Sequence, residues 1–297
     1  MKRHVDIPTD TAETIDRAIA HVDDRLSNGD PALAVQEILA DLFDDRELLQ
    51  RYRSDKRLPS IVEARLRSYN PRNVLTEADR WAEQDLDTCR ESTCLRYLWR
   101  TFDQSPLAHN IAFALPFRQT LANHLFAEAG DGLELYSGIK IQCGHNIHMG
   151  DNAFVHNDVL LDDRGKLVIG DRVTVADRGH LHSHDHDIVD QTDVTTYKTI
   201  IEDDAQVGYS AMVSAGCRVG ENALIGASAM VRGDVPANHV AVGAPAKGVR
   251  VRPGGESAAE PGPLENNRSQ RTLDRTIPED FVEIHEFVRE RAPPEEL

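Results

Sequence analysis

The chain has 297 residues, and its charge argues against one class of partner. Fifty acidic residues outnumber 33 basic ones, giving a net charge of −17, and the bases are 27 Arg and only six Lys. An acidic surface repels phosphate, so we expect no nucleic-acid partner. Strong acidity with little lysine also indicates adaptation to a high-salt cytoplasm, where ions screen the self-repulsion.

Membrane and disulfide signals are both weak. No stretch has the roughly 18–20 apolar residues of a membrane span, and the N-terminal MKRHVDIPTD has no apolar signal core. The four cysteines, Cys89, Cys94, Cys143 and Cys217, form no CxxC pair and suggest no disulfide framework. We therefore expect a cytoplasmic protein without a membrane partner.

Residues 1–130 are predicted to be an α-helical N-terminal region. One apolar set recurs at the three- and four-residue steps of a helix face: Ile15, Ile19, Val22 and Leu26. Both tryptophans, Trp81 and Trp99, lie in this half, and we expect them to pack in its core. No catalytic constellation is recognisable here.

From residue 131 the periodicity changes, because an apolar residue recurs every six positions. A short offset and a longer interruption divide the repeat into three blocks. The markers are Leu135, Ile141, Ile147, Ala153 and Val159, then Ile169, Val175 and Leu181, then Ile201, Val207, Val213, Val219, Ile225 and Val231. This period fits neither a helix nor a simple alternating strand.

A six-residue period predicts the hexapeptide repeat of a parallel β-helix, so the protein should be mainly β. Each hexapeptide would form one flat side, roughly 15–20 Å long at about 3.3 Å per residue, with the marker pointing inward. Three such sides make a coil of about 18 residues. The markers therefore predict nearly five coils, within a domain spanning residues 131–252.

Residues 182–200 break the repeat and should leave the wall as an excursion loop. The stretch HLHSHDHDIVD at 180–190 lies at the base of this loop and has a histidine at every second position. Such a run is compatible with a metal site, a catalytic base or a solvated polar loop.

Beyond the repeat, residues 253–297 are predicted to be a linker followed by a short amphipathic helix. Gly and Pro are frequent up to residue 277. The stretch IPEDFVEIHEFVRER then shows one apolar face: Phe281, Ile284, Phe287 and Val288.

The wall sequence resembles a known family. The block LVIGDRVTVADRGHLHSHDHD, followed by TIIEDDAQVGYSAMVSAGCRVGENALIGASAMVRGDVPANHVAVGAPAKGVR, resembles the hexapeptide-repeat acyltransferases and, among them, the maltose and galactoside O-acetyltransferases. The likeness covers about residues 140–252. It implies a left-handed β-helix, a homotrimer with active sites between adjacent prisms, and acetyl-CoA as acyl donor to a sugar, glycan precursor or similar small hydroxyl compound.

The resemblance also implies site residues. Counting without gaps from Ile169, the family's general base falls on His186, with His184 as the near alternative. The family's acceptor-binding positions fall on Asp162, Asp163 and Asn157. Its cofactor-binding positions fall on Ser210, Ala227, Ser228, Arg232, Lys247 and Arg250. One departure is Gly233, where the family has a lysine.

Two other functions stay open at this point. The γ-class carbonic anhydrases build a zinc site from histidines on the same solenoid, although the mechanism implied above requires no metal. The chain could also be an inactive scaffold whose helical half recruits a partner. A shared fold does not by itself decide between these functions.

Overall fold

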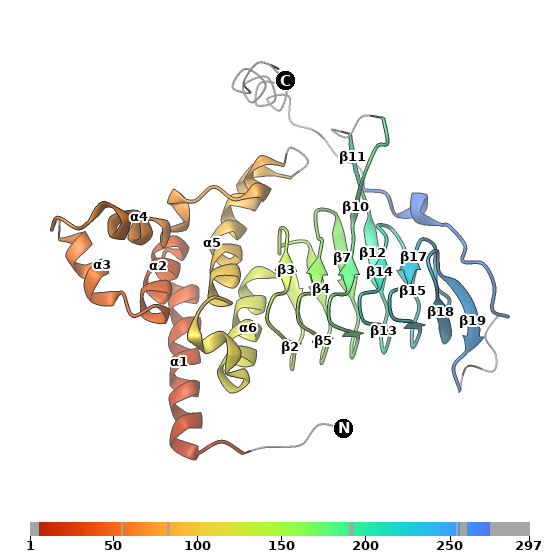
Figure 1. The fold of residues 1–297 in the computed structure, drawn as a ribbon, viewed down its shortest axis with the longest axis horizontal. Coiled ribbons are helices and arrows are strands. Elements are labelled where there is room, and N and C mark those ends of the chain that lie inside the picture. The colour runs from red at the N-terminus through yellow and green to blue at the C-terminus, as the bar shows by residue number, and fades with distance from the viewer. Residues whose placement is uncertain are drawn as a thin grey trace.

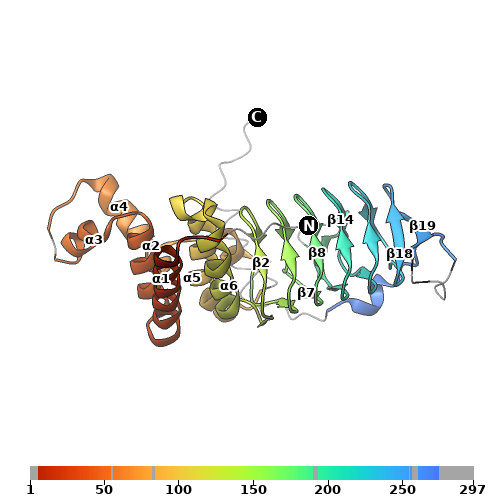
Figure 2. The same ribbon diagram turned by 90° about the horizontal axis from the view of Figure 1, so that it is seen from below.

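The computed structural model describes residues 6–54, 56–81, 84–189, 193–253, 255 and 260–273. Helices gather at one end of an elongated parallel β-solenoid (Figures 1 and 2). The predicted C-terminal amphipathic helix lies outside the described residues. No helix in the described part is long and apolar enough to cross a membrane.

The helical region confirms the predicted amphipathic pattern. Its α-helices are α1 (Thr9–Asn28), α2 (Pro31–Leu42), α3 (Arg46–Arg53), α4 (Ser60–Ser68), α5 (Leu86–Phe102) and α6 (Ile111–Leu125). Its short 3-10 helices are η1 (Pro71–Asn73), η2 (Glu77–Arg80) and η3 (Pro106–His109). In α1 the apolar face buries Ile15, Val22 and Leu26.

The solenoid is a three-sided prism of short strands. The first face stacks β1 (Glu128–Ala129), β4 (Ile147–Met149), β7 (Lys166–Ile169), β12 (Lys198–Ile201) and β15 (Arg218–Val219). The second face stacks β2 (Glu134–Leu135), β5 (Phe154–Val155), β8 (Thr174–Val175), β13 (Gln206–Val207), β16 (Leu224–Ile225) and β18 (His239–Val242), and the antiparallel β19 (Lys247–Val251) ends it. The third face stacks β3 (Lys140–Ile141), β6 (Leu160–Leu161), β9 (His180–Leu181), β14 (Met212–Val213) and β17 (Met230–Val231).

Coil length differs between the two ends of the prism. Phe154 pairs with Thr174, 20 positions later, whereas Met212 pairs with Met230, 18 positions later. The difference lies in the step from the third face to the first, which takes eight residues from Leu161 to Ile169. The predicted coil of about 18 residues is therefore right only for the later coils.

This extra length corrects the predicted register of the early coils. The markers Ile147, Ala153 and Val159 are buried, as predicted. The residues that stack in line with the later markers nevertheless lie two positions further on: Met149, Val155 and Leu161. The second face also carries six parallel strands within the described residues, about one coil more than predicted.

We call the turns between faces the first, second and third corners, in chain order. At the second corner one residue per coil adopts left-handed backbone, with φ between +53° and +75°: Gly138, Asp158, Arg178, Ser210 and Ser228. A non-glycine residue in this conformation costs about 1–2 kcal/mol, which the stacked coils must offset. Ser210 and Ser228 therefore occupy equivalent places in successive coils.

The helices close the N-terminal end of the prism. Trp99 Nε1 donates to Ile139 O at 3.0 Å, and Arg118 Nη1 donates to Leu135 O at 3.3 Å. Asp103 Oδ2 accepts from Gly138 N at 2.8 Å. Backbone groups that the first coil would leave unpaired thus find partners in α5, α6 and the residue after α5.

Candidate active site

The wall opens at the third corner between β9 and β12. Here β10 (His184–His186) and β11 (Val194–Thr196) form an antiparallel hairpin that projects from the prism (Figure 1). The predicted excursion from the wall is therefore present. The wall resumes at Lys198, and residues 190–192 lie outside the described part.

His184 is the histidine of the run that bonds most closely to the wall. Its Nδ1 lies 2.6 Å from Asp162 Oδ2, and its side chain is 16% exposed. Asp162 belongs to the third corner one coil earlier and is 1% exposed. With a carboxylate at Nδ1, we assign the ring proton to that nitrogen, so Nε2 carries a lone pair.

Arg164 faces the other ring nitrogen of His184. Its Nη1 lies 3.1 Å from His184 Nε2, and its guanidinium carbon lies 4.5 Å from the centre of the Trp81 ring. Gln84 Nε2 donates to the carbonyl oxygen of Arg164 at 2.9 Å. The segment before α5 therefore holds a buried cation beside the reactive edge of the imidazole.

The charge state of Asp162 follows from its surroundings. Burial alone would raise the pKa of Asp162, but hydrogen bonds from His182 and His184 outweigh it and hold the pKa well below its usual range. The carboxylate is therefore ionised at neutral pH. An ionised, buried partner orients the imidazole and stabilises its protonated form.

Asp163 has a different role from its neighbour. It is fully buried, and its carboxylate accepts the backbone N–H groups of Gln142, Cys143 and Gly144 at 3.1, 2.8 and 2.6 Å. Burial and the adjacent Asp162 charge raise the pKa of Asp163 to about 6. Its oxygens hold the preceding turn, whereas the resemblance implied that Asp163 would bind the acceptor.

The other histidines of the run differ from His184 in setting. His186 lies on the exposed part of β10, and its ring meets that of His184 edge to face at 5.1 Å. His182 Nδ1 lies 3.4 Å from Asp162 Oδ2, while its buried Nε2 has no hydrogen-bond partner among the described residues. Desolvation lowers the pKa of His180, which favours a neutral ring.

Asn157 lies at the second corner and not beside Asp162. It accepts from Ser137 Oγ at 3.0 Å and donates to Asp177 Oδ1 at 3.0 Å, linking three successive coils. The Asn157 amide is thus already used in a corner ladder. The structure does not bring it together with the Asp162 carboxylate in one chain.

The expected cofactor-binding residues fall in three places. Ser210 is half-buried at the second corner, and Ala227 and Ser228 are exposed at the same corner one coil later. Arg232 is exposed at the third corner of the last coil, and Lys247 and Arg250 are exposed on β19. Since face three separates the second corner from the third, one chain does not bring these serines to His184.

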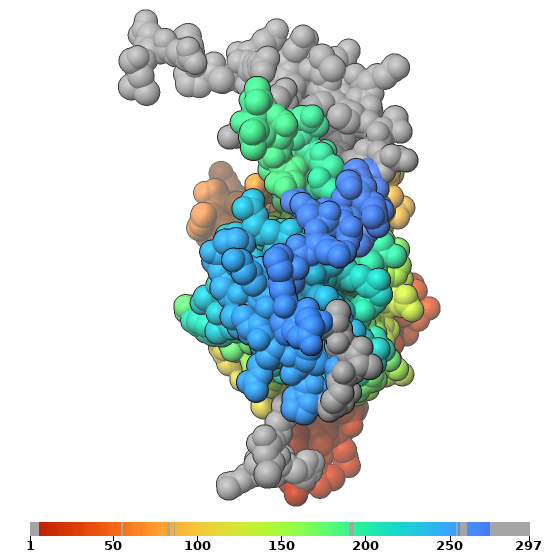
Figure 3. Space-filling view, turned by 90° about the vertical axis from the view of Figure 1, so that its right-hand side faces the viewer, coloured from red at the N-terminus to blue at the C-terminus, as the bar shows by residue number. Residues whose placement is uncertain are grey.

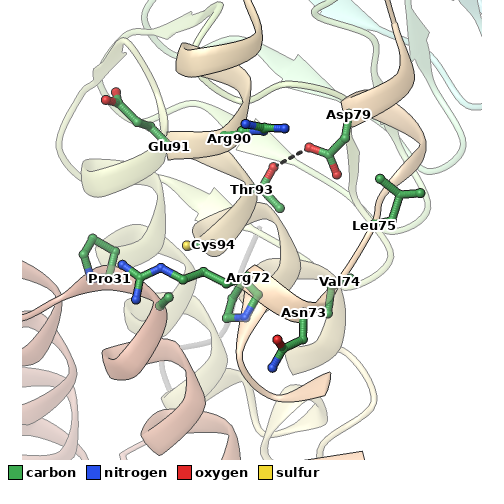
Figure 4. A pocket seen from close by; sticks show the side chains of 12 residues that line it. Pro31, Arg72, Asn73, Val74, Leu75, Asp79, Arg90, Glu91, Thr93 and Cys94 are labelled. Atoms are coloured by element: carbon green, nitrogen blue, oxygen red, sulfur yellow. Dashed lines mark hydrogen bonds between the residues drawn. The ribbon is translucent and has the colours of Figure 1, made fainter. Parts of the chain in front are cut away.

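A pocket lies elsewhere, in the helical region. It encloses about 1010 Å³, and its lining includes Pro31, Arg72, Leu75, Arg90 and Cys94 (Figure 4). None of its lining residues belongs to the set around His184. In the part of the chain that is described, no three His, Cys, Asp or Glu side chains are grouped as metal ligands.

The chain is similar to several known acetyltransferases. It is 27% identical over 137 residues to the galactoside O-acetyltransferase of Escherichia coli, covering 45% of this chain and 68% of that protein. It is 26% identical over 130 residues to the galactoside O-acetyltransferase of Lactococcus lactis, covering 42% of this chain and 63% of that one. No family model matches.

A solved structure shares the fold. The maltose O-acetyltransferase of Clostridium difficile aligns with a TM-score of 0.50 at 24% identity, over 60% of this chain and 98% of that one. These similarities support an acyltransferase that resembles the galactoside and maltose O-acetyltransferases. The fold of this acyltransferase is the parallel β-helix that the six-residue period predicted, with the left hand that the resemblance implied, and a helical region precedes it.

Sequence reasoning missed part of the surroundings of His184 in this acyltransferase. Arg164 directly follows the predicted acidic pair, and adjacency to that pair was the available signal. Trp81 was predicted to pack in the core, yet it is half-buried beneath Arg164, whereas Trp99 is buried as predicted. Trp81 and Arg164 lie 83 positions apart, so no local pattern relates them.

Proposed function

We propose that this acyltransferase transfers an acetyl group from acetyl-CoA to a hydroxyl of a sugar or similar small acceptor. The similarity to two galactoside O-acetyltransferases and to a maltose O-acetyltransferase supports this substrate class. The observation that carries the proposal is the contact between His184 and Asp162 at the break in the wall.

His184 is the general base in this proposal, in preference to His186. A sugar hydroxyl is a poor nucleophile, and a neutral imidazole can remove its proton near neutral pH. His184 Nε2 takes that proton as the acceptor oxygen attacks the thioester carbonyl. The tetrahedral intermediate then collapses, the carbon–sulfur bond breaks, and the departing CoA thiolate takes the proton back from the imidazolium.

Two neighbours of His184 assist. The ionised Asp162 carboxylate holds the ring by Nδ1 and stabilises the imidazolium once it forms. In the structure Arg164 occupies the position next to His184 Nε2. When the acceptor binds, its hydroxyl takes this position and the guanidinium moves aside. Its positive charge then lies beside the carbonyl oxygen on which negative charge develops.

Binding of acetyl-CoA next to His184 by the expected cofactor-binding residues would require a second copy of the chain. Ser210, Ala227 and Ser228 lie at the second corner, and His184 lies at the third. A face about 20 Å wide separates two corners at roughly 3.3 Å per residue. We therefore propose a homotrimer in which one copy supplies the base and its neighbour the serines, while Lys247, Arg250 and Arg232 bind the CoA phosphates.

The compartment is part of the same proposal. All four cysteines are free in the structure. Free thiols fit a reducing compartment. We propose the cytosol, with the acidic surface suited to high salt.

A thiol-release assay tests the proposal. The full chain, in high salt, is given acetyl-CoA and a panel of sugars, and free CoA is measured. His184→Ala should lower kcat by about 10²–10⁴-fold with little change in the KM for acetyl-CoA. Asp162→Asn should lower kcat by a comparable factor, because the Nδ1 partner would lose its charge.

His186→Ala is the matched control, because it removes an imidazole two residues away on the same strand. It should retain most of the activity. If His186→Ala is inactive and His184→Ala is not, the assignment of the base is wrong. Absence of thiol release from the unmodified chain with every acceptor would contradict the acetyl-transfer proposal.

A further inference from the structure

The residues after the repeat form a bracket along the third corner and not a free linker. We define the strap as residues 264–273, which include η4 (Arg268–Arg271). The strap crosses the C-terminal part of the prism and reaches the hairpin (Figure 3). It bonds both to the wall and to the hairpin.

Three residues of the strap bond to the C-terminal part of the wall. Glu265 O accepts from Asp234 N at 2.7 Å, and Asn267 Nδ2 donates to Asp234 Oδ2 at 3.2 Å. Arg271 forms an ion pair with the same carboxylate and donates from Nε to Gly216 O at 2.6 Å. Four polar contacts of these residues therefore anchor the strap to the wall.

Two residues of the strap, Arg268 and Leu273, bond to the two strands of the hairpin. Arg268 Nη2 lies 2.8 Å from Asp185 Oδ2 on β10, and its Nε donates to Ala215 O on the wall. Leu273 N donates to Thr196 O on β11 at 2.8 Å. Arg268 thus joins the wall to the residue that directly follows His184.

Arg268 is the central contact of this bracket. Its guanidinium carbon lies 5.0 Å from the centre of the Tyr197 ring, where β11 returns to the wall, and its side chain is 18% exposed. A guanidinium group that is stacked on a ring, hydrogen-bonded to a carbonyl and paired with a carboxylate is pre-organised, so it loses little side-chain entropy for each bond it forms. The hairpin tip, by contrast, is open: Ile188 is 94% exposed and Val189 is 89% exposed.

We propose that Arg268 is a positioning residue: through Asp185 it holds the hairpin so that His184 stays aligned with Asp162. This inference rests on the proposed function of His184. A catalytic group displaced by about 1 Å can lose roughly 100-fold in rate. The strap would therefore act on turnover without touching either substrate.

Two measurements on the full chain test the inference. Hydrogen exchange of the amides of Tyr197 and Asp187, which bond to Ser183 O and Asp193 O, reports the order of the hairpin. Thiol release reports kcat and the KM for acetyl-CoA. Arg268→Ala and Asp185→Ala should each speed exchange at these amides and lower kcat about fivefold to 20-fold, with KM unchanged.

The pair should behave as one unit. The double variant should be no slower than Arg268→Ala, because each single change already breaks the same link. Arg268→Lys, which keeps the charge but loses the stacked fork, should recover part of kcat. Arg172→Ala breaks the exposed pair of Arg172 with Asp204 at the first corner and is the control, with unchanged kcat and unchanged hairpin exchange.

The outcomes separate this inference from the proposed function. If His184→Ala is inactive while Arg268→Ala keeps full kcat, or if hairpin exchange does not change, the positioning role is overturned. If the unmodified chain releases no thiol, the proposed function and the catalytic half of the inference both fall. The exchange data would then still decide whether the strap holds the hairpin.

Discussion

The third corner of the prism is covered differently on the two sides of the hairpin. On the N-terminal side it packs under the helices: Gly144 lies against Leu125 of α6, and Asp163 ties down the turn beside it. On the C-terminal side, among the described residues, the same corner is covered by the strap, whose arginines bond to Ala215 O and Gly216 O. One cover belongs to the core and the other lies on the surface.

This difference shows how the hairpin gains its two supports. Its inner contact, between His184 and Asp162, is made on the buried side, where eight residues instead of six form the step from the third face to the first. Its outer contact, between Asp185 and Arg268, is made on the exposed side. We therefore expect changes on the N-terminal side to affect folding, and changes on the C-terminal side to affect the hairpin.

The largest effect is expected from Asp163→Ala. It would leave three N–H groups of the 142–144 turn without an acceptor, two of them buried and one partly buried, so the free energy of unfolding should fall by about 3–5 kcal/mol. Urea denaturation measures this change. Asp151→Ala, which removes an exposed acceptor of one N–H group, should cost less than about 1 kcal/mol. Equal losses would contradict the distinction between buried and exposed acids.

A second test adds a methyl group at Gly144. This residue has φ of +84°, and a Cβ there would overlap the Cγ and Cδ1 atoms of Leu125, which is 3% exposed. Left-handed strain and overpacking together should lower the free energy of unfolding by about 2–4 kcal/mol. Gly262→Ala is the control, since nothing lies within 4 Å of its added Cβ and its stability should barely change.

The equivalent change on the strap side should have a smaller effect. Gly216 has φ of +76°, and an added Cβ would lie 2.8 Å from Tyr197 Cδ1 and 3.2 Å from Arg268 Cβ. Because the strap can lift, Gly216→Ala should cost only about 1–2 kcal/mol of global stability. Hydrogen exchange at Tyr197 N should rise. A loss as large as that of Gly144→Ala would mean that the strap is part of the core.

The six-residue period was enough to predict the solenoid and the break, and three- and four-residue steps predicted the helical half. Inward positions of a β-helix must be apolar in every coil, so the fold leaves a repeating signal. The early coils were assigned a wrong length because their two extra residues fall at a polar corner. Asp162, Asp163 and Arg164 carry no periodic signal.

The coil length also decides which histidines lie over Asp162. With coils of about 18 residues, Asp162 would lie under His180; with the observed step of 20, it lies under His182 and close to His184. The count along the chain from Ile169 to His186 begins after this step, so it carries no information on which histidine lies over Asp162. The strap was missed for another reason, since its Gly- and Pro-rich approach is typical of a linker and its bonds to backbone carbonyls leave no pattern in the sequence.

The smallest expected effect concerns pH and the buried side of the corner. The pKa of Asp163 is raised to about 6, above its value of about 3.9 in an unfolded chain. The folded chain then binds more protons than the unfolded chain between these values, so this group stabilises the fold as pH falls and loses that contribution as pH rises through about 6. Between pH of about 7 and about 5.5, the gain should be about 1 kcal/mol.

Other groups titrate in the same interval, so the test is a difference. Burial lowers the pKa of His145 and of His180, and both rings therefore destabilise the fold as pH falls. Urea denaturation of the natural chain and of Asp163→Asn at both pH values cancels these contributions, because the histidines are present in both proteins. Asp163→Asn should lack the gain seen in the natural chain. If both proteins respond alike, Asp163 is ionised throughout, and its three N–H donors outweigh its burial.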